Sequence, residues 1–165
     1  MKTLYLLRHA EAVWNNAHTI DFDRSLSARG LANAASLNAF LIDLGVRFDK
    51  VLCSAAERTR QTQESVLQDV EIGAPTEFLD SLYYASDEVI IDRIKDQSNG
   101  LSTLLIIGHN PAMHHAFEQL SGTEIAGYPT CTLSALTVVG DWRNIQCQAS
   151  TVEYFLSPTR LSERL

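Results

Sequence analysis

The chain has 165 residues, of which 45% are hydrophobic and 20% charged, and a formal net charge of −7. The length predicts a single domain, residues 1–165, that buries a core of its own. An acidic balance without a basic stripe argues against a nucleic-acid-binding protein, and no apolar stretch reaches the length of a membrane span. The first residues do not resemble a signal peptide, and the three cysteines lack disulfide or zinc spacing, so we expect a cytoplasmic protein.

Along the first half of the chain, short apolar segments alternate with helix-like ones. We expect strands at residues 2–7 and 50–53, since both are short apolar runs of the kind found in buried strands. A helix is predicted over 28–44, where apolar side chains recur at helical spacing. The next helix is predicted to begin at Ser54, because Glu57 follows three residues later in a capping-box pattern.

The second half continues the same alternation. Strands are expected at 76–79, 103–107, 132–139 and 149–156, with the last two forming a hairpin. Ser86 is expected to cap a helix that runs to Lys95, and Pro111 suits the first turn of a further helix. The pattern predicts an α/β fold, a three-layer α/β/α sandwich around a mostly parallel central sheet.

Three of the predicted strand-to-helix junctions carry side chains of one chemical type. Arg8 and His9 follow the first strand, Arg58 lies in the first turn of the helix after residues 50–53, and His109 follows the strongly apolar strand 103–107. The carboxyl ends of parallel strands meet at one edge of a sheet, where such folds keep their binding crevices. We therefore expect these four side chains to converge.

This set of side chains suits phosphoryl transfer. A transferring phosphoryl group spreads negative charge over three oxygens, which two guanidiniums, an imidazole and a helix N-terminus can complement. Nearby arginine charges favour a neutral histidine by lowering its pKa. Attack by His9 would form a phosphohistidine intermediate that water later hydrolyses. We therefore expect a reaction that uses neither a metal nor a cofactor.

The order and spacing of these motifs resemble the histidine phosphatase superfamily, whose fold is phosphoglycerate mutase-like, and within it the short SixA-type phosphohistidine phosphatases. The resemblance extends over nearly the whole chain. Its main motifs are Leu6-Leu7-Arg8-His9-Ala10, residues 21–30, residues 52–62 and Ile107-Gly108-His109-Asn110-Pro111.

The resemblance implies a role for each residue of the set. His9 would be the phosphate acceptor, Arg8 and Arg58 would bind the phosphoryl oxygens, and His109 would stabilise their charge. The resemblance also implies two further substrate contacts. Arg24 would lie on the loop over the pocket, and Asn15 matches a substrate-contacting asparagine of the mutases.

A general acid for the leaving group is not evident from the sequence. The candidates are Glu11, Asp21, Asp23, Asp80 and Asp87. A phosphoramidate such as phosphohistidine depends less on an enzyme acid, because its imidazole can leave with a proton that it already holds. This lack and the short chain favour a phosphohistidine-bearing protein as partner, and neither nucleic acid nor membrane is expected. The alternatives are a phosphatase or mutase of a small phosphoester metabolite, or a non-catalytic phosphate-binding module.

Overall fold

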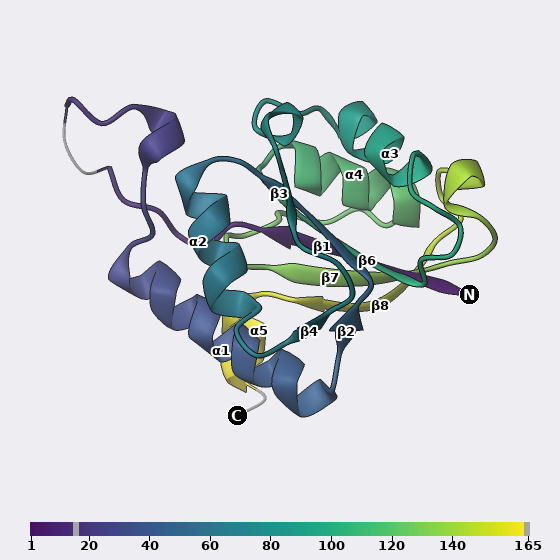
Figure 1. Cartoon of the computed structure of the whole chain (residues 1–165), viewed down its shortest axis with the longest axis horizontal. Coiled ribbons are helices and arrows are strands. Elements are labelled where there is room, and N and C mark those ends of the chain that lie inside the picture. The colour runs from purple at the N-terminus through teal and green to yellow at the C-terminus, as the bar shows by residue number, and fades with distance from the viewer. Residues whose placement is uncertain (15–16, 164–165) are drawn as a thin grey trace.

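The computed structural model describes residues 1–14 and 17–163, and a six-stranded sheet forms its centre (Figure 1). The spatial order is β5-β3-β6-β1-β7-β8. The strands are β1 (Lys2–Arg8), β3 (Lys50–Ser54), β5 (Glu77–Leu79), β6 (Thr103–Gly108), β7 (Leu133–Val138) and β8 (Thr151–Leu156). Pairing is parallel from β5 through β3 and β6 to β1, and antiparallel from β1 to β7 and from β7 to β8. Because β7 alone runs against the other strands of this sheet, the prediction of a mostly parallel sheet is confirmed.

Helices cover both faces of the sheet (Figure 1). On one face lie α3 (Asp87–Lys95) and α4 (Ala112–Ser121), and on the other α1 (Ala28–Leu44), α2 (Glu57–Val66) and α5 (Pro158–Glu163). Side chains alternate between the faces along β1: Leu4 and Leu6 join the core under α3 and α4, whereas Tyr5 and Leu7 join the core under α1 and α2. An uninterrupted apolar strand therefore serves two cores, as the predicted α/β/α sandwich requires.

Local signals place most helix ends as predicted, although Pro111 is the N-cap of α4 and does not lie in its first turn. The hydroxyl of Ser27 accepts from the backbone N–H of Gly30 at the start of α1, and Ser86 caps α3. The helix α2, however, begins at Glu57 with Ala56 as its N-cap, so the predicted start at Ser54 is wrong. Ser54 is the last residue of β3, where it pairs with Leu79 of β5. Its hydroxyl is bound to a histidine at the candidate site instead of capping the helix.

Several short elements complete the fold. The two-residue strands β2 (Arg47–Phe48) and β4 (Glu71–Ile72) pair separately from the main sheet. Within the described residues there are three 3-10 helices: η1 (Asp21–Asp23), η2 (Asp80–Leu82) and η3 (Trp142–Asn144). The last of these lies in the predicted β7–β8 hairpin, where Trp142 is buried and its indole N–H donates to the carbonyl of Leu101 at 2.8 Å.

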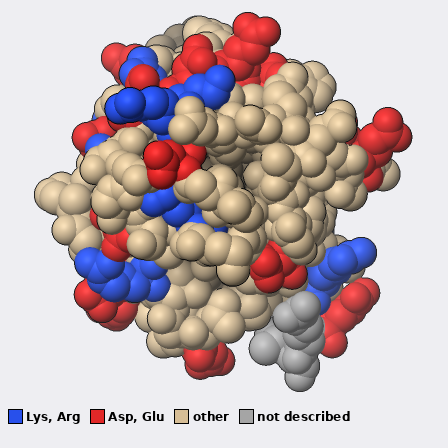
Figure 2. Space-filling view, turned by 90° about the vertical axis from the view of Figure 1, so that its right-hand side faces the viewer, with Lys and Arg blue, Asp and Glu red and all other residues tan. Residues whose placement is uncertain are grey.

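The surface at the amino ends of the parallel strands carries mixed charge. Figure 2 views the molecule from that side and shows acidic and basic side chains interspersed, with no continuous basic stripe on this face. Among residues 1–14 and 17–163, no helix is both long and apolar enough to cross a membrane.

Candidate active site

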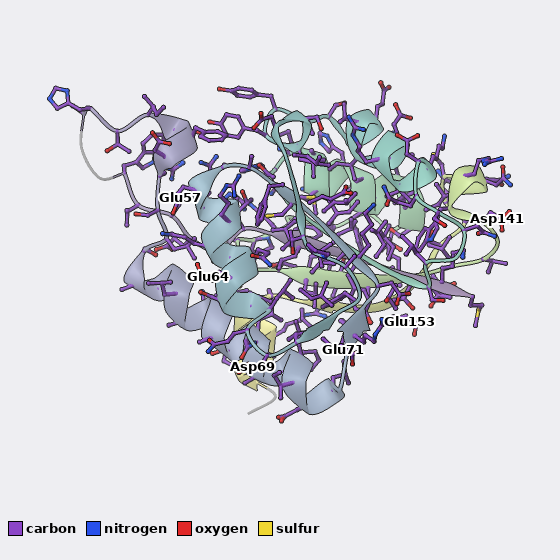
Figure 3. All side chains as sticks on the ribbon, viewed as in Figure 1. Glu57, Glu64, Asp69, Glu71, Asp141 and Glu153 are labelled. Atoms are coloured by element: carbon purple, nitrogen blue, oxygen red, sulfur yellow. The ribbon has the colours of Figure 1, made fainter. Side chains whose placement is uncertain are left out.

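Four side chains meet at the carboxyl ends of β1, β3 and β6. Arg8 ends β1, and its register partner in β6 is Gly108. The following residues, His9 and His109, therefore lie side by side, with ring centroids 5.2 Å apart. Arg58 comes from the first turn of α2, next to Glu57, which is labelled in Figure 3 at this end of the sheet. Parallel pairing of β1, β6 and β3 is what brings these distant parts of the chain together.

The His9 imidazole is buried and is held in one tautomer. Its Nδ1 lies 2.7 Å from the carbonyl oxygen of Ala10. A carbonyl can only accept, so Nδ1 carries the proton and Nε2 keeps its lone pair. Burial lowers the pKa of His9 to about 3, and the charges of His109, Arg58 and Arg8 act in the same direction, while the bond to Ala10 opposes them. At neutral pH this residue is therefore an uncharged base with Nε2 available as a nucleophile.

The two arginines offer hydrogen-bond donors that the protein leaves unused. Arg8 donates from Nη1 to the carbonyl of Tyr128 at 3.0 Å, and Arg58 donates from Nη1 to the carbonyl of Asp21 at 2.7 Å. The Nε atoms of both arginines are buried without a partner in the described part of the chain. Buried donors are nearly always satisfied, so two unpartnered guanidinium nitrogens at one edge indicate a binding site for an oxyanion.

His109 adds a second neutral imidazole. Its Nε2 lies 2.7 Å from the Ser54 hydroxyl, and Nδ1 is buried and lacks a partner among the described residues. Burial and then the charge of Arg58 lower the pKa of His109 to about 4, while Asp21 opposes them. A neutral imidazole carries one N–H, so His109 can donate a hydrogen bond to a bound anion without itself being charged.

Arg24 and Asp21 lie on the loop between β1 and α1. Arg24 donates to the carbonyl of Val13 at 3.2 Å and to Asp21 Oδ1 at 3.1 Å, and it lies 3.7 Å from the centroid of the Trp14 ring. Asp21 also binds Arg58, so the loop adjoins the four central residues. A phosphate contact from Arg24 stays a prediction, because its guanidinium is held by the loop. Asn15 lies outside the described residues.

The five acid candidates do not supply an obvious proton donor. Glu11 accepts from the Ser27 hydroxyl at 3.0 Å beside α1, while Asp23 and Asp80 are exposed and Asp87 lies in the first turn of α3. Although burial raises the pKa of Asp21, hydrogen bonds from Tyr83, Arg24 and Arg58 lower it to about 2. The Asp21 carboxyl is therefore ionised at neutral pH and is a poor general acid.

Some contributors were not predicted. Ser54 was interpreted as a helix cap, yet its hydroxyl contacts His109. Thr62 accepts from the backbone N–H of Ala10 at 3.0 Å and so ties α2 to the residue after His9. The hydroxyl of Tyr83 donates to Asp21. Only tertiary contacts reveal these roles, since serine, threonine and tyrosine have no distinctive spacing here.

The described residues do not suggest a metal centre. Across residues 1–14 and 17–163, no three His, Cys, Asp or Glu side chains are grouped so that they could hold a metal ion. The positive charge at this edge of the sheet comes from Arg8 and Arg58.

Comparisons with known proteins agree with this arrangement. Residues 4–83 match the family described as the histidine phosphatase superfamily (branch 1). An uncharacterised protein of Mycobacterium tuberculosis is 31% identical over 150 residues, covering 85% of this chain and 92% of that protein. The Agrobacterium tumefaciens protein provisionally named phosphohistidine phosphatase SixA is 29% identical, with a TM-score of 0.81 and coverage of 95% and 98% of the two chains. The protein histidine phosphatase SixA complexed with tungstate has the same fold, with a TM-score of 0.82, 22% identity, and coverage of 96% and 99%.

Proposed function

Because the chain belongs to the histidine phosphatase superfamily (branch 1) and is a phosphatase of the SixA type, we propose that it hydrolyses phosphohistidine on a protein, with His9 as the phosphate acceptor. The observation that carries this proposal is the fixed tautomer of His9: Nδ1 donates to Ala10, so Nε2 is unprotonated at the centre of the site. A buried, neutral imidazole beside two arginines is prepared for attack on an electron-poor phosphorus atom.

The reaction has two steps. In the first, the lone pair of His9 Nε2 forms a bond to phosphorus while the bond from phosphorus to the substrate imidazole breaks, and that imidazole takes the electron pair. In the second, water attacks the phosphorus of phosphorylated His9, releasing inorganic phosphate and restoring the neutral imidazole. The displaced proton of water leaves with phosphate or solvent, so each step balances.

The surrounding charges favour the site with a bound phosphoryl group over the empty site. Arg58 is buried and Arg8 is partly buried, and burial together with the charge of Arg58 lowers the pKa of Arg8. A dianionic phosphoryl group relieves this repulsion and receives the unused Nε donors. His109 is proposed to donate a further hydrogen bond as negative charge grows on the equatorial oxygens.

The lack of a suitable acid supports a phosphoramidate substrate. When the second nitrogen of phosphohistidine is protonated, its imidazole leaves as a neutral molecule and needs no proton from the enzyme. An alkoxide leaving group, in contrast, needs a proton in the transition state. The ionised Asp21 cannot supply that proton at neutral pH, and Glu11 binds Ser27 beside α1.

The rim of the site supports a macromolecular substrate. The side chain of Trp14 is 69% exposed and contacts Arg24, and Tyr84 is 88% exposed beside Tyr83. Exposed aromatic residues around a site of this kind commonly contact protein partners. A phosphoryl group displayed on a protein surface could therefore reach His9 while the protein packs against the rim.

The proposal is tested by comparing kcat/KM for a phosphohistidine-bearing protein, a phosphohistidine peptide and a panel of small phosphoesters. We expect the protein to be the best substrate and the phosphoesters the poorest. The His9→Ala variant should lose turnover of every substrate, and the exposed His115→Ala should retain it. Faster hydrolysis of a small phosphoester than of either phosphohistidine substrate would favour a metabolite phosphatase, and turnover by His9→Ala would refute the mechanism.

A further inference from the structure

Asp21 places a fixed negative charge beside a site that is otherwise suited to an anion. Its Oδ2 accepts from Arg58 Nη2 at 3.0 Å and from the Tyr83 hydroxyl, and its Oδ1 accepts from Arg24 Nη1 at 3.1 Å. Its backbone carbonyl accepts from Arg58 Nη1. These partners come from the β1–α1 loop, from α2 and from the segment after β5, so the carboxylate is held from three sides.

The hydrogen bonds to Asp21 leave Arg58 able to bind substrate. The bonds to Asp21 use one N–H on each terminal nitrogen of the guanidinium, and Nε is buried without a partner in the described chain. A guanidinium has five N–H donors, so three remain. Arg58 can therefore hold Asp21 and a phosphoryl oxygen at the same time, and the carboxylate need not leave when the anion binds.

The Asp21 carboxylate lies between the buried residues and solvent. His9, Arg58 and His109 are buried, whereas the Asp21 side chain is 39% exposed. In-line displacement puts the leaving group on the side of phosphorus opposite His9 Nε2. A substrate that enters from solvent has its leaving group on the outward side, which is the side on which Asp21 lies.

We infer that Asp21 is a specificity-determining residue that disfavours phosphorylated substrates whose leaving group is negatively charged. A second carboxylate near Asp21 would be repelled, while the neutral or cationic imidazole of phosphohistidine is not. Like charges several ångströms apart at a partly exposed site change affinity by about three- to tenfold. The inference rests on the proposed function, which it deepens by explaining how one phosphate site rejects acidic metabolites.

The test uses two ligands that differ in one charged group, glycerol 3-phosphate and 3-phosphoglycerate. Their Kd values are measured by calorimetry, which does not require turnover, for the wild type and for Asp21→Asn. The amide keeps the size of the side chain and one oxygen acceptor. We expect the wild type to prefer glycerol 3-phosphate and Asp21→Asn to reduce that preference about three- to tenfold. If Asp21→Asn loosens Arg58 and so weakens the binding of both ligands equally, the ratio of their two Kd values does not change.

Asp23→Asn is the matched control, because Asp23 lies on the same 3-10 helix and is exposed. It removes the same charge and should leave the Kd ratio at the wild-type value. An unchanged ratio in Asp21→Asn, or an equal change in Asp23→Asn, would overturn the inference. High salt should shrink the preference of the wild type but not that of Asp21→Asn, and a salt response that is the same in both proteins would count against it.

Turnover of a phosphohistidine peptide, measured in parallel, separates this inference from the proposed function. A wild type that binds both ligands with the expected preference but does not hydrolyse the peptide would contradict the proposed function and support the role of Asp21. A wild type that hydrolyses the peptide but shows no charge preference would support the proposed function and contradict the role of Asp21.

Discussion

His9 and His109 are neutral in the folded protein because burial lowers the pKa of His9 to about 3 and that of His109 to about 4. In the unfolded chain a histidine titrates near pH 6.5. As pH falls below that value, the unfolded state takes up protons that the folded state does not. The stability that depends on these neutral rings is therefore complete above about pH 6.5 and declines toward acid pH.

We expect His9→Ala to make stability less sensitive to acid. One such histidine contributes about 1 kcal/mol to the loss of stability between pH 7 and 5.5. Urea denaturation at the two pH values should show a smaller loss for His9→Ala by about that amount. The exposed His115→Ala should behave as the wild type, and an equal loss in all three proteins would contradict the buried neutral state of His9.

The Ser54 hydroxyl should matter more to activity than its size suggests. It is buried and lies 2.7 Å from His109 Nε2, so Ser54→Ala leaves a buried ring nitrogen without its partner. Such a loss costs about 1–3 kcal/mol, and we expect kcat on phosphoramidate to fall about tenfold or more. Ser81→Ala, at an exposed position of η2, should keep wild-type kcat. Equal kcat values in both variants would show that Ser54 does not orient His109.

At the scale of elements, α1 packs directly on the backbone that follows His9. A Cβ added to Gly30 in the first turn of α1 would lie 2.1 Å from the carbonyl oxygen of Glu11, a contact that no side-chain rotation can relieve. We expect Gly30→Ala to lower the free energy of unfolding by about 2–3 kcal/mol and to reduce activity by moving the loop. The measurement is chemical denaturation together with kcat/KM.

Gly100→Ala is the matched control for that substitution. A Cβ there would approach only the Ser98 hydroxyl oxygen, at an ordinary 3.6 Å, so its stability should stay within about 0.5 kcal/mol of the wild type. If the two glycine variants were equally stable, the tight contact between α1 and Glu11 would not exist in solution.

The sequence predicts elements well where one local rule decides the structure. The apolar strands at Lys2–Arg8 and Thr103–Gly108 and the Ser86 cap are examples. Ser54 shows the limit of such rules. The sequence around it has the capping-box pattern, but in the folded protein its hydroxyl is hydrogen-bonded to His109. The strands β2 and β4 have two residues each, which is too short for any periodicity to show.

The same limit applies at the candidate site. The motifs that place Arg8, His9 and His109 follow strands whose parallel pairing fixes their positions, so their convergence could be expected. Asp21 was one of five acid candidates, and nothing in its sequence neighbours indicates its three side-chain partners. A carboxylate's role depends on which charges fold around it, and these come from segments far apart in the chain.

At the scale of the whole molecule, a small cationic site lies within a chain of net charge −7. The local charge of Arg8 and Arg58 acts at close range, while the net charge acts over distances up to the Debye length, about 10 Å at 0.1 M salt. A partner that approaches the rim meets the net charge first. Its own charge should therefore affect the rate of encounter more than the chemistry at His9.

Because the net charge governs encounter and the local charge governs binding at His9, we expect opposite salt effects for two phosphohistidine peptides of the same length, one acidic and one basic. Adding salt from about 20 to about 200 mM should raise kcat/KM for the acidic peptide and lower it for the basic one, because screening weakens repulsion and attraction alike. The kcat values should change little, since the phosphoryl group is bound by buried side chains that salt screens less. An uncharged peptide corrects for direct competition by salt anions at Arg8 and Arg58. If the acidic peptide were the better substrate at low salt, a local basic surface around the rim, and not the net charge, would control the encounter.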